Sequence, residues 1–175
     1  MLIWETSAAD EASAQRVAQH AIGRAECLRR DDGQGWLVLC GSGVAPPGVV
    51  ETRATRILGA GDVAADAGAW VFLVGIWTPR EWGEELCAWY RDEHGPILLE
   101  CPQWRGFELL ESSVASGCQF HALHRLSDRA ALDSDERRRS RATPWFARLA
   151  ANAWFDAPFE RVLAQRASVV ACPAQ

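Results

Sequence analysis

The segment AWVFLVGIW, residues 69–77, limits the fold of this chain more than any other stretch. Alternate side chains of a β-strand point to opposite faces of the sheet, and in this segment both alternating sets are apolar. Such a strand needs a cover on each side. The next residues, Thr78-Pro79-Arg80-Glu81, are typical of a helix start, with an N-cap, a first-turn proline and a capping-box glutamate. We therefore predict a central strand followed directly by a helix.

This helix is predicted to be amphipathic. Its apolar side chains recur at helical spacing: Trp82, Leu86, Trp89 and Tyr90. Gly95-Pro96 is predicted to end or kink the helix, because proline lacks the backbone N–H that the next helical hydrogen bond requires.

Four further elements complete a recognisable order. Residues 106–113 and 118–126 predict two strands of an antiparallel hairpin, joined by the turn-like VASG. Residues 133–154 predict a helix capped by Asp133 or Ser134 and interrupted at Thr143-Pro144, where a new turn can start. Residues 158–166 alternate like a last strand. The order from residue 69 onward is βαββαβ, which predicts an α+β, ferredoxin-like unit with an antiparallel sheet.

Residues 1–68 predict a partial copy of the same unit. Strands are expected at 2–5, 35–42 and near 49–58, which gives the order βαββ. The helix between the first two is indicated by apolar residues at helical spacing: Val17, Ala21, Ala25 and Leu28. We predict two parts, 1–68 and 69–175, with the second packed against the first or against a second subunit.

The charged residues exclude several functions. All eighteen positive side chains are arginine, and the sequence has no lysine. Schiff-base chemistry, pyridoxal phosphate anchoring and the P-loop all need a lysine amine. The formal net charge of -5 argues against nucleic acid as a partner, because binding phosphates needs a concentrated positive field. Four arginines at 137, 138, 139 and 141 follow acidic residues at 133, 135 and 136, and we interpret them as a solvated helical face.

The cysteines and apolar runs bear on location. The six cysteines lie at least thirteen positions apart, so no C-x-x-C pair starts a zinc or redox site. The N-terminal residues show neither the basic nor the apolar region of a secretory signal. No apolar run approaches the roughly 20 residues that span a bilayer. We therefore expect a cytoplasmic protein with free thiols and no membrane partner.

Two motifs that suggest cofactors do not hold. GAGDVA, residues 59–64, matches G-x-G-x-x-A, but only five residues separate Ala64 from Trp70, which leaves no room for the helix of a dinucleotide site. His121 and His124 lie three apart on a predicted strand and so face opposite sides, where they cannot bind one metal ion together. We interpret GAGDVA as a flexible connector and expect no metal and no cofactor.

The stretch AWYRDEHGPILLECPQWRGFELLES, residues 88–112, resembles the signature of the dimeric α+β barrel superfamily, particularly its EthD-like members. The matching residues are Trp89, Tyr90, Glu93, His94, Pro96, Leu98, Leu99, Pro102 and Trp104. ATPWFARL, near Pro144, is also similar to the second helix of such proteins. The resemblance covers about residues 69–166.

The resemblance implies a homodimer or a fused tandem whose two sheets enclose an apolar cavity, which would bind a small apolar or aromatic molecule. Relatives include cofactor-free oxygenases acting on aromatic polyketides, lactone isomerases and dehalogenating enzymes. It thus implies an enzyme that performs proton transfer on a small aromatic, lactone or polyketide-like substrate. The alternative is a non-catalytic ligand-binding or assembly module of the same fold.

His94 is the candidate general acid–base, because histidine titrates near neutral pH. It continues the apolar stripe four residues beyond Tyr90, so its ring is expected to reach the cavity. The alternative is a histidine that only stabilises the helix C-terminus. Candidate substrate-binding residues, of which the arginines could hold a carboxylate, are Tyr90, Trp77, His121, His124, Arg105 and Arg125. For the two strand histidines the alternative is a hydrogen-bonded position in the core or at its rim.

Overall fold

The structure is a computed structural model and describes residues 1–64, 66–114, 117–155 and 160–172, without the side chains of 113, 114, 117 and 118. Its strands are β1 (Leu2–Thr6), β2 (Ala21–Arg30), β3 (Trp36–Gly43), β4 (Val50–Arg53), β5 (Thr55–Gly61), β6 (Trp70–Thr78), β7 (Trp104–Val114), β8 (Gly117–Leu126) and β9 (Glu160–Cys172). Its helices are α1 (Glu11–Ala18), α2 (Gly83–Trp89), α3 (Gly95–Leu99), α4 (Asp135–Ser140) and α5 (Pro144–Ala150). Shorter helical turns are η1 (Arg80–Trp82), η2 (Tyr90–His94) and η3 (Arg129–Asp133).

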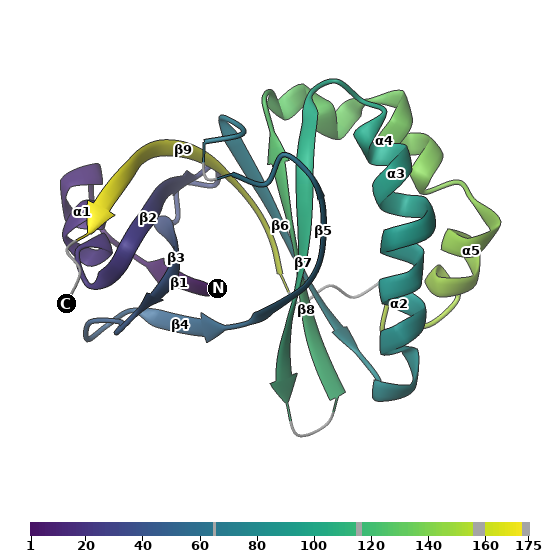
Figure 1. The fold of residues 1–175 in the computed structure, drawn as a ribbon, viewed down its shortest axis with the longest axis horizontal. Helices are drawn as coiled ribbons and strands as arrows, with labels where there is room; N and C mark the ends of the chain where they lie inside the picture. The colour runs from purple at the N-terminus through teal and green to yellow at the C-terminus, as the bar shows by residue number, and fades with distance from the viewer. Residues whose placement is uncertain (65, 115–116, 156–159, 173–175) are drawn as a thin grey trace.

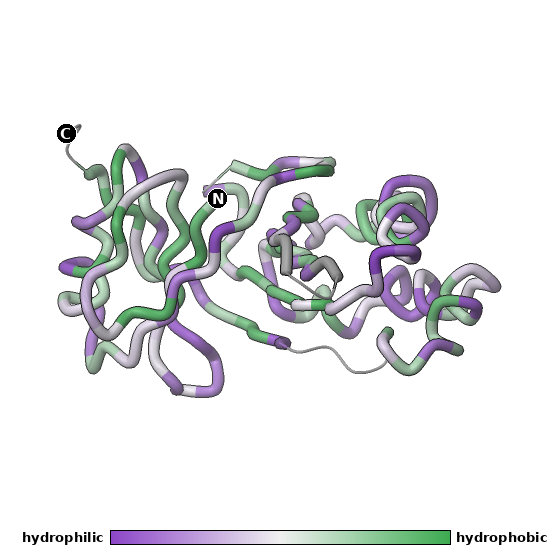
Figure 2. Tube along the Cα trace, turned by 90° about the horizontal axis from the view of Figure 1, so that it is seen from below, coloured by the Kyte–Doolittle hydropathy of each residue, from purple (hydrophilic) through white to green (hydrophobic). Residues whose placement is uncertain are grey.

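The fold is ferredoxin-like α+β with an antiparallel sheet, as the sequence predicts. From β6 onward the strands lie in the order β9-β6-β8-β7, with β7 and β8 paired as the expected hairpin. Helices α2 to α5 cover one face of this group of strands, and β1 to β4 with α1 lie beyond the other face (Figure 1). The helices alternate between hydrophilic and hydrophobic residues (Figure 2), as amphipathic helices with one buried face do.

The sheet curls until its two faces oppose each other within one chain. Its full order is β4-β1-β3-β2-β9-β6-β8-β7-β5. The strands at the two ends of this order, β4 and β5, are neighbours in the chain and only Ala54 separates them. β9 pairs with β6 through its first half and with β2 through its second, so it arches from one group of strands to the other (Figure 1).

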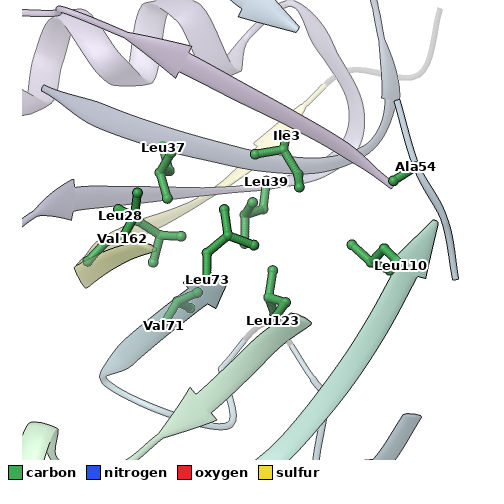
Figure 3. Packing of buried hydrophobic residues seen from close by; sticks show 11 residues of the cluster. Ile3, Leu28, Leu37, Leu39, Ala54, Val71, Leu73, Leu110, Leu123 and Val162 are labelled. Atoms are coloured by element: carbon green, nitrogen blue, oxygen red, sulfur yellow. The ribbon is translucent and has the colours of Figure 1, made fainter. Parts of the chain in front are cut away.

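Aliphatic side chains fill the space between the opposed faces (Figure 3). Ile3, Leu37 and Leu39 point inward from β1 and β3, and Leu73 and Leu123 meet them from β6 and β8. Each such side chain contributes about 1.5–3 kcal/mol when fully buried. They do not fill the space completely, since a second hollow between the sheets is lined by Leu39 and Leu110 and by the charged Glu26 and Arg125. Its charged lining differs from the mostly apolar cavity that the resemblance implied. The cover that β6 requires comes from the same chain.

The N-terminal helix is shorter than the sequence predicts. α1 ends at Ala18, and Ala21, Ala25 and Leu28 belong to strand β2 instead. The register of β2 against β3 shifts between Ile22 and Ala25, where Gly23 has a φ of +88°. The bulge separates Ala21 from Ala25, and the strand is then buried on both faces from Ala25 to Leu28, so its buried apolar residues recur at an apparent helical spacing. The prediction of one helix across residues 17–28 was wrong for that reason.

The helix after β6 does not end at Gly95-Pro96. It widens into the π turn η2 and continues as α3, and the N–H of Gly95 donates to the carbonyl of Tyr90, five residues back. Pro96 has no backbone N–H to donate to a carbonyl of the preceding turn. The wider π turn accommodates this missing helical hydrogen bond. A Cβ on Gly95 would lie 2.3 Å from the ring of Phe107, so the backbone of this turn packs directly on the sheet.

Other local expectations have mixed outcomes. The helix predicted at 133–154 is interrupted as expected, with Thr143 capping α5 by accepting from the N–H of Phe146. Ser134, one of the two candidate caps, accepts from the N–H of Arg137. In contrast, Gly59–Gly61 of the expected connector form the end of β5, paired with β7. The last strand extends to Cys172, well beyond the predicted residue 166.

Candidate functional site

A cavity of about 90 Å³ lies between the helices and the outer face of the β6-β8 sheet. Its walls are mainly aromatic and come from five elements and the segment after α5: Phe72, Trp89, Tyr90, Trp104, Phe146 and Phe155. Two histidines and three arginines also line it: His94, His124, Arg137, Arg141 and Arg161. No aspartate or glutamate is among its described lining residues. The cavity is therefore aromatic, with basic groups only.

His94 lies at the end of the π turn and is 8% exposed. Its ring stacks on Trp89, with centroids 4.1 Å apart, and meets Tyr90 edge-on at 5.0 Å. The imidazole hydrogen-bonds the backbone of Ser140, and no partner for its Nδ1 exists among the described residues. Since a backbone carbonyl can only accept, Nε2 carries the proton and Nδ1 offers a free lone pair.

The electrostatics keep His94 neutral. Burial, and then the neighbouring His124, hold the pKa of His94 well below its usual range. An isolated imidazole in this position is therefore a hydrogen-bond acceptor at neutral pH, not a cation. The dipole-stabilised, charged histidine that the sequence left open as an alternative does not fit these surroundings.

His124 and Tyr90 complete the polar part of the wall. The Nδ1 of His124 accepts a hydrogen bond from the indole N–H of Trp104 at 3.2 Å. Burial, and then Arg137, lower the pKa of His124 to about 3, so this ring is also neutral. Burial raises the pKa of Tyr90 above its usual value, so its phenol keeps its proton. Both groups can contact a ligand in the cavity without carrying charge.

The arginines of α4 are not all on a solvated face, and the sequence interpretation is corrected here. Arg138 and Arg139 do pair with surface carboxylates, those of Asp135 and Glu100. Arg137 is half-buried and lines the cavity together with Arg141, one helical turn further on. The i, i+4 spacing of these two was the available signal, because it places them on one side of the helix. Arg161 of β9 was missed altogether.

Arg137 is in an unfavourable place for a cation. Burial, and then Arg141, lower the pKa of Arg137, and Arg161 adds to the effect while Asp133 opposes it. Among the described residues, none of the three cavity arginines forms an ion pair with a carboxylate. The guanidinium of Arg137 lies 5.8 Å from the centroid of the Phe72 ring.

Four other predicted site residues lie away from this cavity. His121 and Arg125 point to the opposite face of β8 from His124, as their spacing predicts. Trp77 lies on the opposite face of β6 from Phe72 and Ile76, which line the cavity, and is half-buried. Arg105 is exposed at the bulge that follows Trp104 in β7. The structure therefore brings together His94, Tyr90 and His124 but none of these four.

Two of the four are bound to groups of the chain itself. Arg125 grips the carboxylate of Glu26 with both terminal nitrogens, at 2.5 and 2.7 Å, inside the barrel. Arg125 thus does bind a carboxylate in a bidentate manner, but this carboxylate belongs to Glu26 in β2. His121 lies 2.8 Å from the hydroxyl of Ser112 through its Nε2.

Within the described ranges, no group of three or more histidine, cysteine, aspartate or glutamate side chains is placed to hold a metal ion. In the same residues no helix has the length and apolarity needed to cross a membrane.

No protein-family model matches the chain, and no curated protein matches its sequence. Solved structures do match its fold. A monooxygenase-like protein from Listeria innocua aligns with a TM-score of 0.64 at 12% identity, covering 95% of this chain and 93% of that one. An anthrone oxidase-like protein gives 0.67 at 10% identity, covering 97% and 91%.

A heme-degrading enzyme from Listeria monocytogenes gives a TM-score of 0.62 at 12% identity, covering 94% of this chain and 99% of that one. Another match, also from Listeria monocytogenes, is described as a ferredoxin fold protein related to antibiotic biosynthesis monooxygenases, with 0.61 at 12% identity and coverage of 95% and 94%. At these identities the likeness concerns the fold alone. The chain thus shares the ferredoxin-like α+β fold of proteins related to antibiotic biosynthesis monooxygenases.

Proposed function

We propose that this protein binds a small aromatic molecule in the cavity between helices and sheet and catalyses proton transfer on it, with His94 as the base. One observation carries the proposal: the Nδ1 of His94 is buried in an aromatic cavity and has no partner among the described residues. Buried polar atoms without partners are rare, and those found in cavities are candidates for contacts with a ligand.

The chemistry follows from the state of each group. Nδ1 of His94 accepts a proton from an acidic C–H or O–H of the substrate, and the electron pair of the broken bond stays on the substrate as an enolate or phenolate. Tyr90 keeps its proton and donates a hydrogen bond to the substrate oxygen, and His124 packs beside it. In an isomerase or cyclase the proton returns to another substrate atom, whereas in an oxygenase the carbanion transfers electrons to molecular oxygen.

The cavity volume favours substrates at the small end of the expected range. About 90 Å³ is less than the roughly 150 Å³ of an engineered cavity that admits benzene. A one-ring ligand therefore has to displace a side chain at the rim. Arg141 and Arg161 are exposed, and exposed side chains change rotamer rapidly.

Haem, suggested by one structural neighbour, does not fit this cavity. Pockets for drug-sized ligands measure roughly 300–1,000 Å³, and the cavity is well below that range. The aromatic walls would have to separate before a porphyrin could enter. We therefore derive no step through haem.

Deuterium exchange tests the proposal without knowledge of the later reaction. In heavy water the protein should accelerate exchange of the benzylic protons of phenylpyruvate or phenylacetone, followed by proton NMR. His94→Gln should reduce the catalysed rate about 10²–10⁴-fold, the usual contribution of a general base. His20→Gln, at an exposed histidine, is the matched control and should leave the rate unchanged.

Exchange no faster than in buffer with either compound would count against catalysis and favour the alternative, a non-catalytic ligand-binding or assembly module. Closer kinship with EthD-like proteins, a homodimer and a cytoplasmic location remain predictions. The barrel closes within one chain, so the fold does not require a partner subunit to cover β6. Light scattering of the purified protein tests the homodimer.

A further inference from the structure

We propose that the ligand of this cavity is a small planar aromatic carboxylate, whose charged group is held by Arg137, Arg141 and Arg161 and whose ring lies against the aromatic wall. This inference deepens the proposed function and rests on the same cavity. It concerns the charge of the ligand, which the proton-transfer proposal leaves open.

The positive charge of the cavity has no described carboxylate beside it. Three guanidinium groups line one small cavity, and none of them pairs with a described carboxylate. Arg137 is half-buried, and its charge is disfavoured by burial and by Arg141 and Arg161. Like charges gathered in a partly desolvated place destabilise the ligand-free protein, and an anion between them removes that cost.

The arginines of α4 and its C-cap fall into two groups, those that line the cavity and those paired at the surface. Four of the five residues from 137 to 141, in α4 and its C-cap, are arginines. All four belong to a protein whose net charge is negative. Arg138 and Arg139 are exposed, do not line the cavity, and form ion pairs with Asp135 and Glu100. Carboxylates therefore lie near this helix, but none of the described carboxylates lines the cavity. On the side that faces the cavity Arg137 donates only to the carbonyl of Leu132, and among the described residues it has no carboxylate partner.

The geometry of the basic groups matches a carboxylate. A guanidinium offers two parallel N–H groups in a plane, which match the two oxygens of a carboxylate. Arg137 and Arg141 both lie near aromatic rings, with their guanidinium carbons 5.8 Å from the Phe72 centroid and 5.5 Å from that of Phe146. A benzoate-like molecule would meet aromatic surface with its ring and guanidinium groups with its charge at the same time.

A bound carboxylate would also make His94 a better base. A negative charge nearby favours the imidazolium form and so raises the affinity of Nδ1 for a proton. The low basicity of His94 in the empty cavity would then be a property of the ligand-free protein only.

Calorimetric titration with benzoate and with benzamide, its neutral isostere, tests the inference. Benzoate should bind on the order of tenfold or more tightly than benzamide, as expected for hydrogen bonds to a charged group. Arg137→Gln and Arg141→Gln should each remove most of that preference. Arg138→Gln, on the same helix but paired outside the cavity, should retain it. Equal affinity for the two compounds, or the same loss in Arg138→Gln, would overturn the inference.

Two additions separate the possible causes of failure. Arg161→Gln, on β9, should also reduce the preference even if a substitution in α4 disturbs that helix. Phenylphosphonate distinguishes a carboxylate site from a general oxyanion site, and tighter binding of phenylphosphonate than of benzoate would overturn the carboxylate assignment. Preference for benzoate without any proton exchange would support the charge assignment and refute catalysis. Proton exchange without a preference for benzoate would support catalysis and refute the charge assignment.

Discussion

The two faces of the β6-β8 sheet bury arginine in opposite ways. On the barrel side, Arg125 is 2% exposed and binds both oxygens of Glu26, and only its Nε lacks a partner among the described residues. On the helix side, Arg137 faces a cavity without a described carboxylate to pair with. The filling differs as well, since aliphatic side chains pack the barrel and aromatic rings line the cavity.

The presence or absence of a carboxylate partner distinguishes arginines that stabilise the fold from arginines that we propose bind a ligand. A buried charge with a geometrically matched partner has its interactions complete in the folded chain. Arg137 donates a hydrogen bond to the carbonyl of Leu132, but it has no carboxylate partner among the described residues and lies next to a histidine nitrogen without a partner. The same residue type thus has two roles in one protein, and the following substitutions test the division.

The largest effect is expected from Arg125→Met. It leaves the carboxylate of Glu26 buried without its partner, which should lower the free energy of unfolding by about 3–5 kcal/mol. Arg137→Met should change it by no more than about 1 kcal/mol, because the charge removed there is already disfavoured. Urea denaturation measures both. Equal losses would mean that Arg137 is as structural as Arg125.

The histidines of the cavity provide the next contrast. His124→Phe leaves the indole N–H of Trp104 buried without an acceptor, so it should cost about 1–3 kcal/mol. His94→Phe removes a nitrogen that has no partner among the described residues but also the bond to Ser140, so its cost should stay within about 1 kcal/mol. Thermal unfolding of both variants checks the order. A more damaging His94→Phe would point to a structural role for His94.

Glu160 of β9 adds a carboxyl to the comparison, half-buried and in surroundings that disfavour its charge. Burial, and then Glu5, raise the pKa of Glu160 to about 7. Between its ordinary pKa and this value the folded protein binds more protons than the unfolded chain, so this group's contribution to stability is lost as pH rises toward 8. The buried neutral histidines His94, His121 and His124 act in the opposite direction in any variant that keeps them, so the test is the difference between wild type and Glu160→Gln. The urea midpoint of the wild type should fall relative to that of Glu160→Gln between pH 5 and pH 8, and a difference that does not change with pH would contradict the assignment.

The smallest effect is expected in the protons taken up on ligand binding. If a carboxylate raises the pKa of His94, benzoate should bind with uptake of a fraction of a proton near pH 6 and bind more weakly as pH increases. Calorimetry in two buffers of different ionisation enthalpy measures this uptake. It should vanish in His94→Gln and persist in His20→Gln. Uptake that survives in His94→Gln would assign the proton to another group.

The sequence by itself determined the parts of the fold that depend on local pattern. The doubly apolar strand, the helix after it, the hairpin and the break at Thr143-Pro144 all follow from periodicity and backbone chemistry. The cap predicted at Thr78 was wrong, because Pro79 precedes the turn η1, Trp82 precedes α2, and neither start has a side-chain cap hydrogen bond. The opposite orientation of His121 and His124 follows from periodicity as well, because side chains three apart on a strand must face different sides. These features need only residues near one another in the chain.

Tertiary structure decided what depends on distant neighbours. Arg125 and Glu26 are 99 positions apart, and nothing local in either segment indicates their pairing. The apolar residues of β2 recur at helical spacing, yet the segment is a strand. Its pairing with β3 and β9 outweighs that local pattern. The side of α4 that faces the cavity, and with it the roles of Arg137 and Arg141, was set when the helix packed against the sheet. Burial and charge at a site are sums over surrounding atoms, so the low basicity of His94 exists only in the folded protein.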